Sequence, residues 1–164
     1  MSSVRSSKKS PSVPPADTAA PASEPVDTGF LRTLVGYNTR RAALSIIAVF
    51  MERMAVYDLK VVDFSVLSLV AHNPGITSRQ LCATLSVLPP NMVGLIAALE
   101  RRGLIERRPH PSDGRAMGVH LTPAGVELTA QAEQTAAQLE EDATHRLTAA
   151  ERKTLIRLLQ KVYD

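Results

Sequence analysis

The sequence has little of what disulfide-rich, membrane-spanning or aromatic-core proteins depend on. Its 164 residues include one cysteine, Cys82, no tryptophan and only 4% aromatic residues. A single cysteine excludes an intrachain disulfide and suits a reducing compartment. No apolar run reaches the roughly 18 residues that span a bilayer. Because 45% of the residues are hydrophobic and aromatics are scarce, we expect a soluble, cytoplasmic, mainly helical protein with no membrane partner.

Catalytic and metal-binding patterns are also missing from the sequence. The four histidines have no second ligand at metal-binding spacing; they are His72, His110, His120 and His145. No Ser-His-Asp set and no glycine-rich phosphate loop is present. The sequence therefore predicts no enzyme, no metal and no cofactor. Cys82 lies beside Leu81 with no adjacent basic residue, which favours a structural role over redox sensing.

The first 28 residues have the composition of a disordered tail. They are rich in Ser, Pro and Ala, and their only large hydrophobic residues besides Met1 are valines. Such a segment cannot bury enough apolar surface to fold. Its three basic residues are matched by three acidic ones, so a solvated tail is favoured over one that contacts DNA phosphates. We therefore expect a single folded domain over residues 29–164.

Two short helices and a hairpin are predicted within residues 76–121. Thr77 and Gln80 form a capping box that begins the first helix, and Pro89 suits the first position of the second. Gly103 ends that helix. An Asp-Gly pair then predicts a hairpin between the strands LIERR and GVHL. Two helices followed by a hairpin are the plan of a winged helix-turn-helix, in which the second helix enters the DNA major groove.

The second predicted helix has one apolar face and one face of small residues. The apolar face, which we expect to be buried, consists of Met92, Leu95, Ile96 and Leu99. The opposite face and its flanks consist of Pro90, Asn91, Val93, Gly94, Ala97, Ala98 and Arg101. A glycine inside a helix costs roughly 1 kcal/mol relative to alanine. Gly94 therefore indicates a close approach, either by DNA or by another helix of the same protein. Asn91 can pair with adenine, Val93 can touch thymine methyl groups, and Arg101 can reach a phosphate or a guanine.

The predicted hairpin, or wing, offers further arginines to DNA. Arg107 and Arg108 on its first strand can bind backbone phosphates, and Arg115 at the tip can enter a narrow minor groove with Asp113 holding it in position. The alternative is a solvated tip with an internal Asp113–Arg115 pair. With the start of the first helix included, the predicted DNA contacts are Thr77, Arg79, Pro90, Asn91, Val93, Gly94, Arg101, Arg107, Arg108, Asp113 and Arg115.

The run RGLIERRPHPSDGRA followed by LTPAG resembles the DNA-binding core of the MarR family of bacterial transcriptional regulators. That family carries a GL-x-x-R strand, a D-x-R wing and an LT-x-x-G step into the next helix. The resemblance covers roughly residues 29–164 and is strongest over 76–125. One departure is Gly94, near whose position many members carry an arginine. The resemblance implies a homodimeric repressor that a small aromatic acid or its coenzyme A thioester releases from DNA.

The helices on either side are predicted to form a dimerisation arm. A helix over about 30–56 has two apolar stripes, so one side faces its own domain and the other a second subunit. We assign 29–58 and 123–164 to the arm and 63–121 to the winged helix-turn-helix. A two-fold dimer would place its recognition helices in successive major grooves about 34 Å apart. The operator should then be a near-palindrome in double-stranded DNA.

Capping signals set the remaining helix boundaries. Asp63 is expected to cap the helix before the helix-turn-helix. Thr122 begins a long helix that runs to about Arg146, and Thr148 with Glu151 forms the capping box of the last helix.

The resemblance places a ligand between the arm and the helix-turn-helix. Arg40 and Arg41 lie beside an apolar stripe of the first helix, where an unpaired guanidinium would be costly. Arg40 therefore binds either a ligand carboxylate or phosphate or an acidic residue such as Glu140 or Glu141. The candidate ligand-binding residues are Tyr37, Arg40, Arg41, Met51, Met54, Phe64 and Leu67.

Two functions remain open on the sequence alone. One is a ligand-responsive DNA-binding repressor, and the alternative is a winged-helix module that binds protein through the small face around Gly94. Residues 74–120 carry six basic and three acidic side chains, whereas residues 121–164 carry five and seven. This asymmetry favours a protein that faces a polyanion with one end. Affinity for duplex DNA that falls steeply with salt would separate the two functions.

Overall fold

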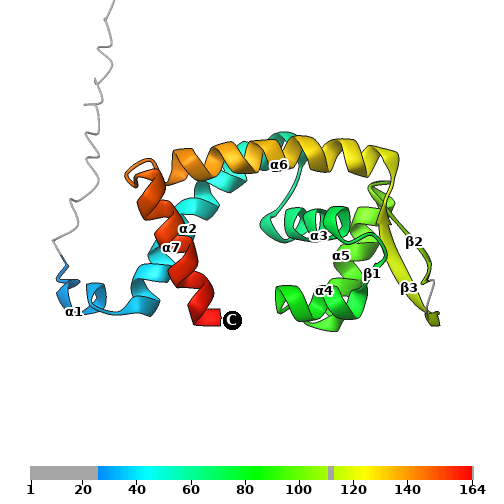
Figure 1. Ribbon diagram of the computed structural model, residues 1–164, viewed down its shortest axis with the longest axis horizontal. Helices are drawn as coiled ribbons and strands as arrows, with labels where there is room; N and C mark the ends of the chain where they lie inside the picture. Colours follow the sequence, from blue (N-terminus) through cyan, green and yellow to red (C-terminus); the bar gives the residue numbers. More distant parts are fainter. Residues whose placement is uncertain (1–25, 111–112, 164) are drawn as a thin grey trace, which may run out of the picture.

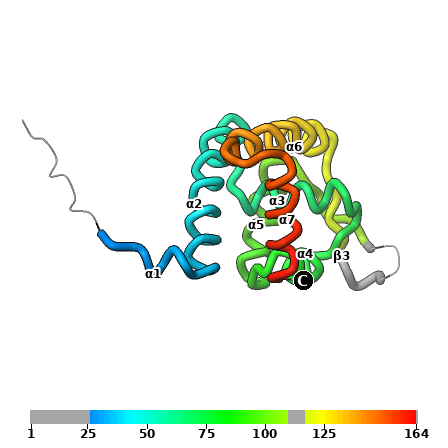
Figure 2. Tube along the Cα trace, turned by 60° about the vertical axis from the view of Figure 1, so that its left-hand side comes forward, coloured from blue at the N-terminus to red at the C-terminus, as the bar shows by residue number. Residues whose placement is uncertain are grey.

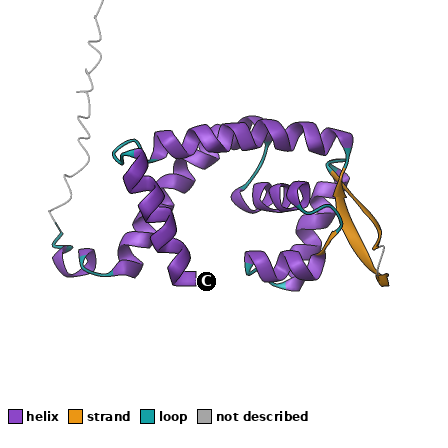
Figure 3. Cartoon of the chain, in the orientation of Figure 1, coloured by secondary structure: helices purple, strands orange, loops and turns teal. Residues whose placement is uncertain are grey.

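The computed structural model describes residues 26–110 and 113–163, without the side chains of residues 110 and 113–116. The predicted tail lies outside these residues over positions 1–25. Helices make up most of the described chain, and the strands gather at one end of the molecule (Figure 3). The fold is thus the predicted one, mainly α with a small β wing.

A long helix, α6 (Pro123–Ala143), runs along one side of the molecule and the other elements lie beneath it in two groups (Figure 1). One group consists of α1 (Gly29–Arg32), α2 (Val35–Met54) and α7 (Ala149–Tyr163). The other consists of α3 (Val61–His72), α4 (Ser78–Leu85), α5 (Pro89–Arg101) and the sheet. The tube view, turned by 60°, keeps α2 separate from α4 and α5 (Figure 2). We call the first group, with the adjoining end of α6, the arm.

The sheet contains one strand more than the hairpin predicted from the sequence. Its order is β1-β3-β2, all antiparallel, with β1 at Ile76–Thr77, β2 at Ile105–His110 and β3 at Asp113–Leu121. β1 pairs with β3, and the Gly75 N–H extends the pairing to the carbonyl of Val119 at 2.9 Å. A two-residue strand has no periodicity of its own, so only this pairing defines it.

The core lies where α2, α3, α4, α5, α6 and the sheet meet. Its fully buried members come from all of these elements; they are Met54, Val66, Leu67, Val70, Leu81, Met92, Ile96, Leu99, Val119 and Leu139. Phe50 and Phe64 make an edge-to-face contact with ring centroids 5.6 Å apart. Among residues 26–110 and 113–163, no single helix is long and apolar enough to cross a membrane.

The single helix predicted over about 30–56 is wrong, because the structure breaks it near Thr33. Leu34 has an extended backbone (ψ 128°) and separates α1 from α2. Side chains satisfy the carbonyls at the break: the Thr33 hydroxyl donates to Phe30 O at 2.7 Å, and the Asn38 amide donates to Arg32 O and Leu34 O at 2.8 Å. At the other end, α2 passes into a short 3-10 helix, η1 (Ala55–Tyr57).

Two predicted helix boundaries also need correction. The helix after η1 begins at Val61, so Asp63 lies inside its first turn. Asp63 still serves the helix start, because its Oδ2 accepts the Lys60 N–H at 3.1 Å. The long helix ends at Ala143 rather than near Arg146. The capping box of Thr148 with Glu151 is confirmed.

Candidate nucleic-acid interface

A short turn fixes the angle between α4 and α5. Ser86 adopts a left-handed backbone (φ 53°), and the Val87 N–H donates to the carbonyl of Cys82 at 3.1 Å. Leu88 is extended, and Pro89 occupies the first position of α5 as predicted. The two helices are bent by 115° at this turn, within the range of a helix-turn-helix.

The start of α4 is tied to the sheet. Thr77 ends β1 opposite Gly118 and also caps α4. Its N–H donates to Gln80 Oε1 at 2.9 Å, and the Gln80 N–H donates to Thr77 Oγ1 at 3.3 Å. Arg79, in the first turn of α4, is exposed. The capping box predicted from the sequence is therefore present, and it fixes α4 relative to the wing.

The exposed face of α5 is the predicted one. Met92, Ile96 and Leu99 are buried, and Leu95 is partly buried against the same core. The exposed residues of the helix include Pro90, Asn91, Val93, Gly94 and Arg101. The two alanines of this face, Ala97 and Ala98, are half-buried. A narrow strip without bulky side chains therefore points to solvent.

Gly94 is open on its outer side. A Cβ added there would meet no other side chain or distant backbone atom of the described chain within 4 Å. The alternative that Gly94 packs on another helix of this chain is therefore wrong within the described residues. The space in front of this glycine is free for a partner.

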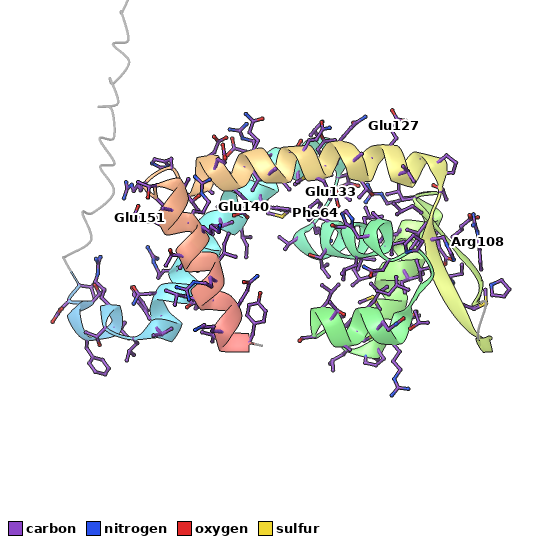
Figure 4. The ribbon with its side chains drawn as sticks, in the orientation of Figure 1. Phe64, Arg108, Glu127, Glu133, Glu140 and Glu151 are labelled. Carbon is purple, nitrogen blue, oxygen red and sulfur yellow. The ribbon has the colours of Figure 1, made fainter. Side chains whose placement is uncertain are left out.

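Two of the wing arginines, Arg107 and Arg108, are engaged in ion pairs within the chain. Arg107 on β2 donates to both carboxylate oxygens of Glu100 on α5, at 2.8 and 2.6 Å. This hydrogen bonding lowers the pKa of Glu100 and raises the pKa of Arg107. Arg108 pairs with Glu106 on the same strand and points away from the helices (Figure 4). The side chains of Asp113 and Arg115 lie outside the described residues.

Two glycines allow the wing to pack closely against its neighbours. A Cβ on Gly118 would lie 2.7 Å from the carbonyl oxygen of Gly75, and one on Gly125 would lie 1.9 Å from the carbonyl oxygen of Leu104. Gly125 is the glycine of the LTPAG sequence. The Thr122 Oγ1 accepts its N–H at 3.1 Å, and the Thr122 N–H donates to Leu104 O at 3.1 Å. This sequence therefore joins the wing, the end of α5 and the start of α6.

The comparisons with known proteins agree with this geometry. The model of the MarR family matches residues 57–116. The Multiple antibiotic resistance protein MarR of Salmonella typhimurium is 36% identical over 106 residues, which are 64% of this chain and 74% of that protein. The chain belongs to the MarR family.

Two further similar proteins extend the MarR-family comparison. A Thauera aromatica protein named as a transcriptional regulator for the hcr operon is 37% identical over 100 residues, and the match spans 61% of this chain but only 60% of that protein. A solved structure of the transcriptional repressor CouR bound to a 23-mer DNA duplex has a TM-score of 0.80 and 34% identity. The structural match covers 85% of this chain and 99% of the CouR chain. The matched relatives are transcriptional regulators rather than enzymes.

A ligand-bound relative has also been solved. The MarR-family protein Rv2887 of Mycobacterium tuberculosis, in complex with salicylic acid, has a TM-score of 0.65 and 26% identity, and covers 79% of this chain and 96% of that one.

The predicted ligand-binding residues of this MarR-family chain are spread along its length. Met54 and Leu67 are buried in the core, and Phe64 is partly buried against it. Tyr37 is half-buried, whereas the other members of the set are exposed; they are Arg40, Arg41 and Met51. Tyr37 and Met51 are on the same helix, about 21 Å apart at 1.5 Å per residue. The single chain does not gather these side chains into one cavity, and their role stays a prediction.

The acidic partners suggested for Arg40 are engaged elsewhere or exposed. Glu141 lies 3.4 Å from Arg152 of α7, and Glu140 is exposed. Another ion pair on the arm joins Arg53 to Asp142 at 2.8 Å. The salt bridge considered as one alternative, from Arg40 to Glu140 or Glu141, is therefore absent among the described residues.

The sequence did not single out Glu100, Arg102 or Tyr57. Glu100 meets Arg107 because the hairpin folds back beside α5. Arg102, just after α5, donates to the carbonyls of Tyr57 and Asp58. These contacts depend on the tertiary arrangement, and no local sequence pattern marks them.

Proposed function

We propose that this chain is a homodimeric repressor that binds a near-palindromic operator and leaves it when a small aromatic carboxylate or its coenzyme A thioester binds. The observation that carries the proposal is the exposed strip of α5 around Gly94, set at helix-turn-helix geometry beside a wing. The likeness to CouR bound to a DNA duplex supports it. A regulator of this kind acts where the chromosome lies, which in a bacterium is the cytoplasm.

Within this proposal α5 reads base edges and its neighbours bind the backbone. Asn91 and Val93 contact bases, and the absent side chain of Gly94 allows the helix to enter deeply. Arg101, Arg79 and the wing arginines contact phosphates. Arg107 must then exchange its carboxylate partner for a phosphate oxygen. Asp113 and Arg115 act at the wing tip.

The proposed dimer rests on apolar surface that the single chain leaves open. No residue of α1 or α7 is buried. Large apolar side chains of α1, α2 and α7 are exposed, including Phe30, Val35, Leu44, Ile156, Leu158 and Val162. A groove of about 640 Å³ between α2 and α7 is lined mainly by apolar residues. Exposed surface of this kind marks an interface, and a two-fold dimer also supplies the second recognition helix.

The effector would act by population shift. It releases DNA only if it binds better to a conformation whose recognition helices do not match the operator, and a few kcal/mol of difference is enough. We consider two places that offer cations to its carboxylate. One is Arg40 and Arg41 on the arm, and the other is Lys60 at the hollow between α5 and the start of α3.

Isothermal titration would locate the effector. Salicylate and benzoyl-coenzyme A would be titrated into the wild-type protein, Arg40→Ala and Lys60→Ala. We expect Arg40→Ala to weaken binding at least tenfold, about 1.4 kcal/mol, and Lys60→Ala to leave it unchanged. The opposite pattern would move the ligand to the hollow, and binding by none of the proteins would remove aromatic acids as effectors.

Duplex binding tests the DNA half of the proposal. The wild-type protein would select duplexes from a randomised pool, and affinity for the selected duplex would be measured across a salt series. We expect a linear fall of log affinity with log salt whose slope reports several phosphate contacts, at about 0.9 per contact. A protein that ignores duplex DNA even at low salt would instead support the alternative, a winged-helix module that binds protein.

A further inference from the structure

The C-terminal end of α5 is joined to the junction between the arm and the DNA-binding elements. Arg102 caps α5, and its own N–H donates to the carbonyl of Ala98 at 3.2 Å. Its guanidinium donates to the carbonyl oxygen of Asp58 at 2.8 Å and to that of Tyr57 at 2.9 Å. Tyr57 ends η1, and Asp58 is its left-handed cap, with φ 50°. One side chain thus holds the recognition helix against the end of the arm.

The chemistry of this contact requires the shape of arginine. The last carbonyls of a helix lack intrahelical partners and carry partial negative charge. A planar guanidinium can donate to two of them at once, whereas an ammonium is a compact point charge. The Asp58 carboxylate lies 3.9 Å away and its side chain is 97% exposed. The contact is therefore defined by the hydrogen bonds to the two carbonyls. A side chain with the same charge but a different shape, such as that of lysine, would not reproduce them.

The same junction is fixed to α6 by the tyrosine. The Tyr57 hydroxyl lies 2.9 Å from Thr135 Oγ1 and donates to the carbonyl of Gln131 at 3.4 Å. Thr135 and Gln131 belong to α6, which runs from the wing to the arm (Figure 1). Tyr57 and Arg102 therefore connect α6, η1 and α5 in series.

A hollow separates α5 from the rest of this junction. It has a volume of about 750 Å³ and is bordered by Lys60 and Asp63 on one side and by Pro90, Gly94 and Ala98 on the other, with Arg102 at its rim. Side chains do not fill the space between α5 and the start of α3. On this side of α5 the polar contact with the junction is therefore the one made by Arg102, whereas the buried face of the helix packs in the core.

We propose that Arg102 and Tyr57 are positioning residues that set the separation of the two recognition helices by fixing α5 to the arm. This inference rests on the proposed function as a dimer on a two-fold operator. In such a dimer a tilt of each DNA-binding unit about η1 changes the distance between half-sites. The wild-type protein should then reject operators whose half-sites are moved by one base pair, and weakening the contact should relax that rejection.

The test compares affinities for duplexes that differ only in half-site spacing. The duplex selected by the wild-type protein would be compared with versions that have one base pair added or removed between the half-sites. For Arg102→Lys and Tyr57→Phe we expect the ratio of affinities between selected and altered spacing to fall at least about fivefold, as for the loss of a hydrogen bond to a charged group or of allosteric coupling. Arg53→Gln removes an arginine that pairs with Asp142 on the arm, and we expect it to keep the wild-type ratio.

The outcomes separate this inference from the function on which it rests. A wild-type protein without duplex binding would overturn both. Suppose instead that Arg102→Lys and Tyr57→Phe keep the wild-type ratio of affinities between selected and altered spacing. That result would overturn the positioning role alone, even if both variants melt at lower temperature. Should Arg102→Lys fail to fold, the ratio measured for Tyr57→Phe decides the question, because that change leaves the Arg102 contacts in place.

Discussion

At the scale of single residues, Gly94 gives the sharpest separation between folding and DNA binding. A Cβ there meets no distant atom of the described chain within 4 Å, so Gly94→Ala should stabilise the fold by up to about 1 kcal/mol through helix propensity. The same methyl group would stand between α5 and the bases. We expect specific duplex affinity to fall by about 1–3 kcal/mol, the usual cost of one mismatched contact, and non-specific affinity to change less. Thermal unfolding and duplex titration measure the two effects. A variant that is more stable and binds its selected duplex as well as the wild type would contradict the close approach.

Gly125 should respond to the same substitution in the opposite way. The added Cβ would lie 1.9 Å from the carbonyl oxygen of Leu104, so α6 or the segment just before β2 must move. We expect Gly125→Ala to cost about 1–3 kcal/mol or more, as overpacking does. Denaturant unfolding measures this, and Gly94→Ala is the matched control because the chemical change is identical. Equal stability of the two variants would mean that the wing does not need this close contact.

The Glu100–Arg107 pair predicts a pH-dependent contribution to stability. The hydrogen bond from Arg107 holds the pKa of Glu100 below its usual value, so the contribution is present above the unfolded pKa of Glu100 and is lost as the pH falls through the lower, folded value. Since the Arg107 side chain is 46% exposed, water screens the pair and its worth is at most about 1 kcal/mol. Glu100→Gln should therefore have a lower free energy of unfolding than the wild type at pH 7 and the same free energy of unfolding in acid. Denaturant unfolding at a series of pH values measures this difference.

The same variant tests whether Arg107 reaches DNA. Without the carboxylate, Arg107 need not break an ion pair before it binds a phosphate. We therefore expect Glu100→Gln to bind duplex DNA more tightly, with the same salt slope because the number of phosphate contacts in the complex is unchanged. Weaker binding would show instead that Glu100 must hold Arg107 in the complex.

At the scale of helices and strands, the sequence predicted the helix boundaries that are set by hydrogen bonds between residues close together in the chain. The caps formed by Thr77, Thr122 and Thr148 satisfy donors within three residues of themselves, so they are visible in the sequence. The break at Leu34 was missed because it depends on Asn38 reaching back to two carbonyls across the break. Strand β1 was missed because it exists only through pairing with β3.

The candidate site likewise has features that the sequence predicted and features that it did not. The face of α5 follows from its helical period, and the structure bears out which side is buried. The Arg102 contacts to Tyr57 and Asp58 could not be predicted, because they join segments more than forty residues apart. Five of the seven predicted ligand-binding residues lie on α2 and the other two on α3, yet a helix spreads such residues along its axis at about 1.5 Å per residue. A pocket needs residues from several elements, which periodicity alone does not place.

At the scale of the whole molecule, the arm is the part whose surface a single chain leaves uncovered. Its last helix, α7, is fifteen residues long and buries none of them. Isolated helices of about 12–15 residues are marginal in water, so α7 needs a partner surface. The groove beside it is lined by side chains from both α2 and α7. The interface we propose therefore involves both ends of the folded chain, and the distance between the recognition helices is set through it.

Leu158→Glu tests this interface. Leu158 is 49% exposed in the single chain and lines the groove between α2 and α7, so a carboxylate there should cost an isolated subunit little. In a dimer the charge would be buried without a partner, which is strongly unfavourable. Sedimentation equilibrium should show a dimer for wild type and a monomer for Leu158→Glu. Gln160→Glu on another face of α7 adds the same charge and should remain dimeric. A lone recognition helix contacts a single half-site, so the monomer should bind its duplex far more weakly. Hydrogen exchange should also show that the backbone amides of α7 are unprotected in the monomer. A wild-type protein that sediments as one subunit would remove the two-fold geometry on which near-palindromic recognition depends.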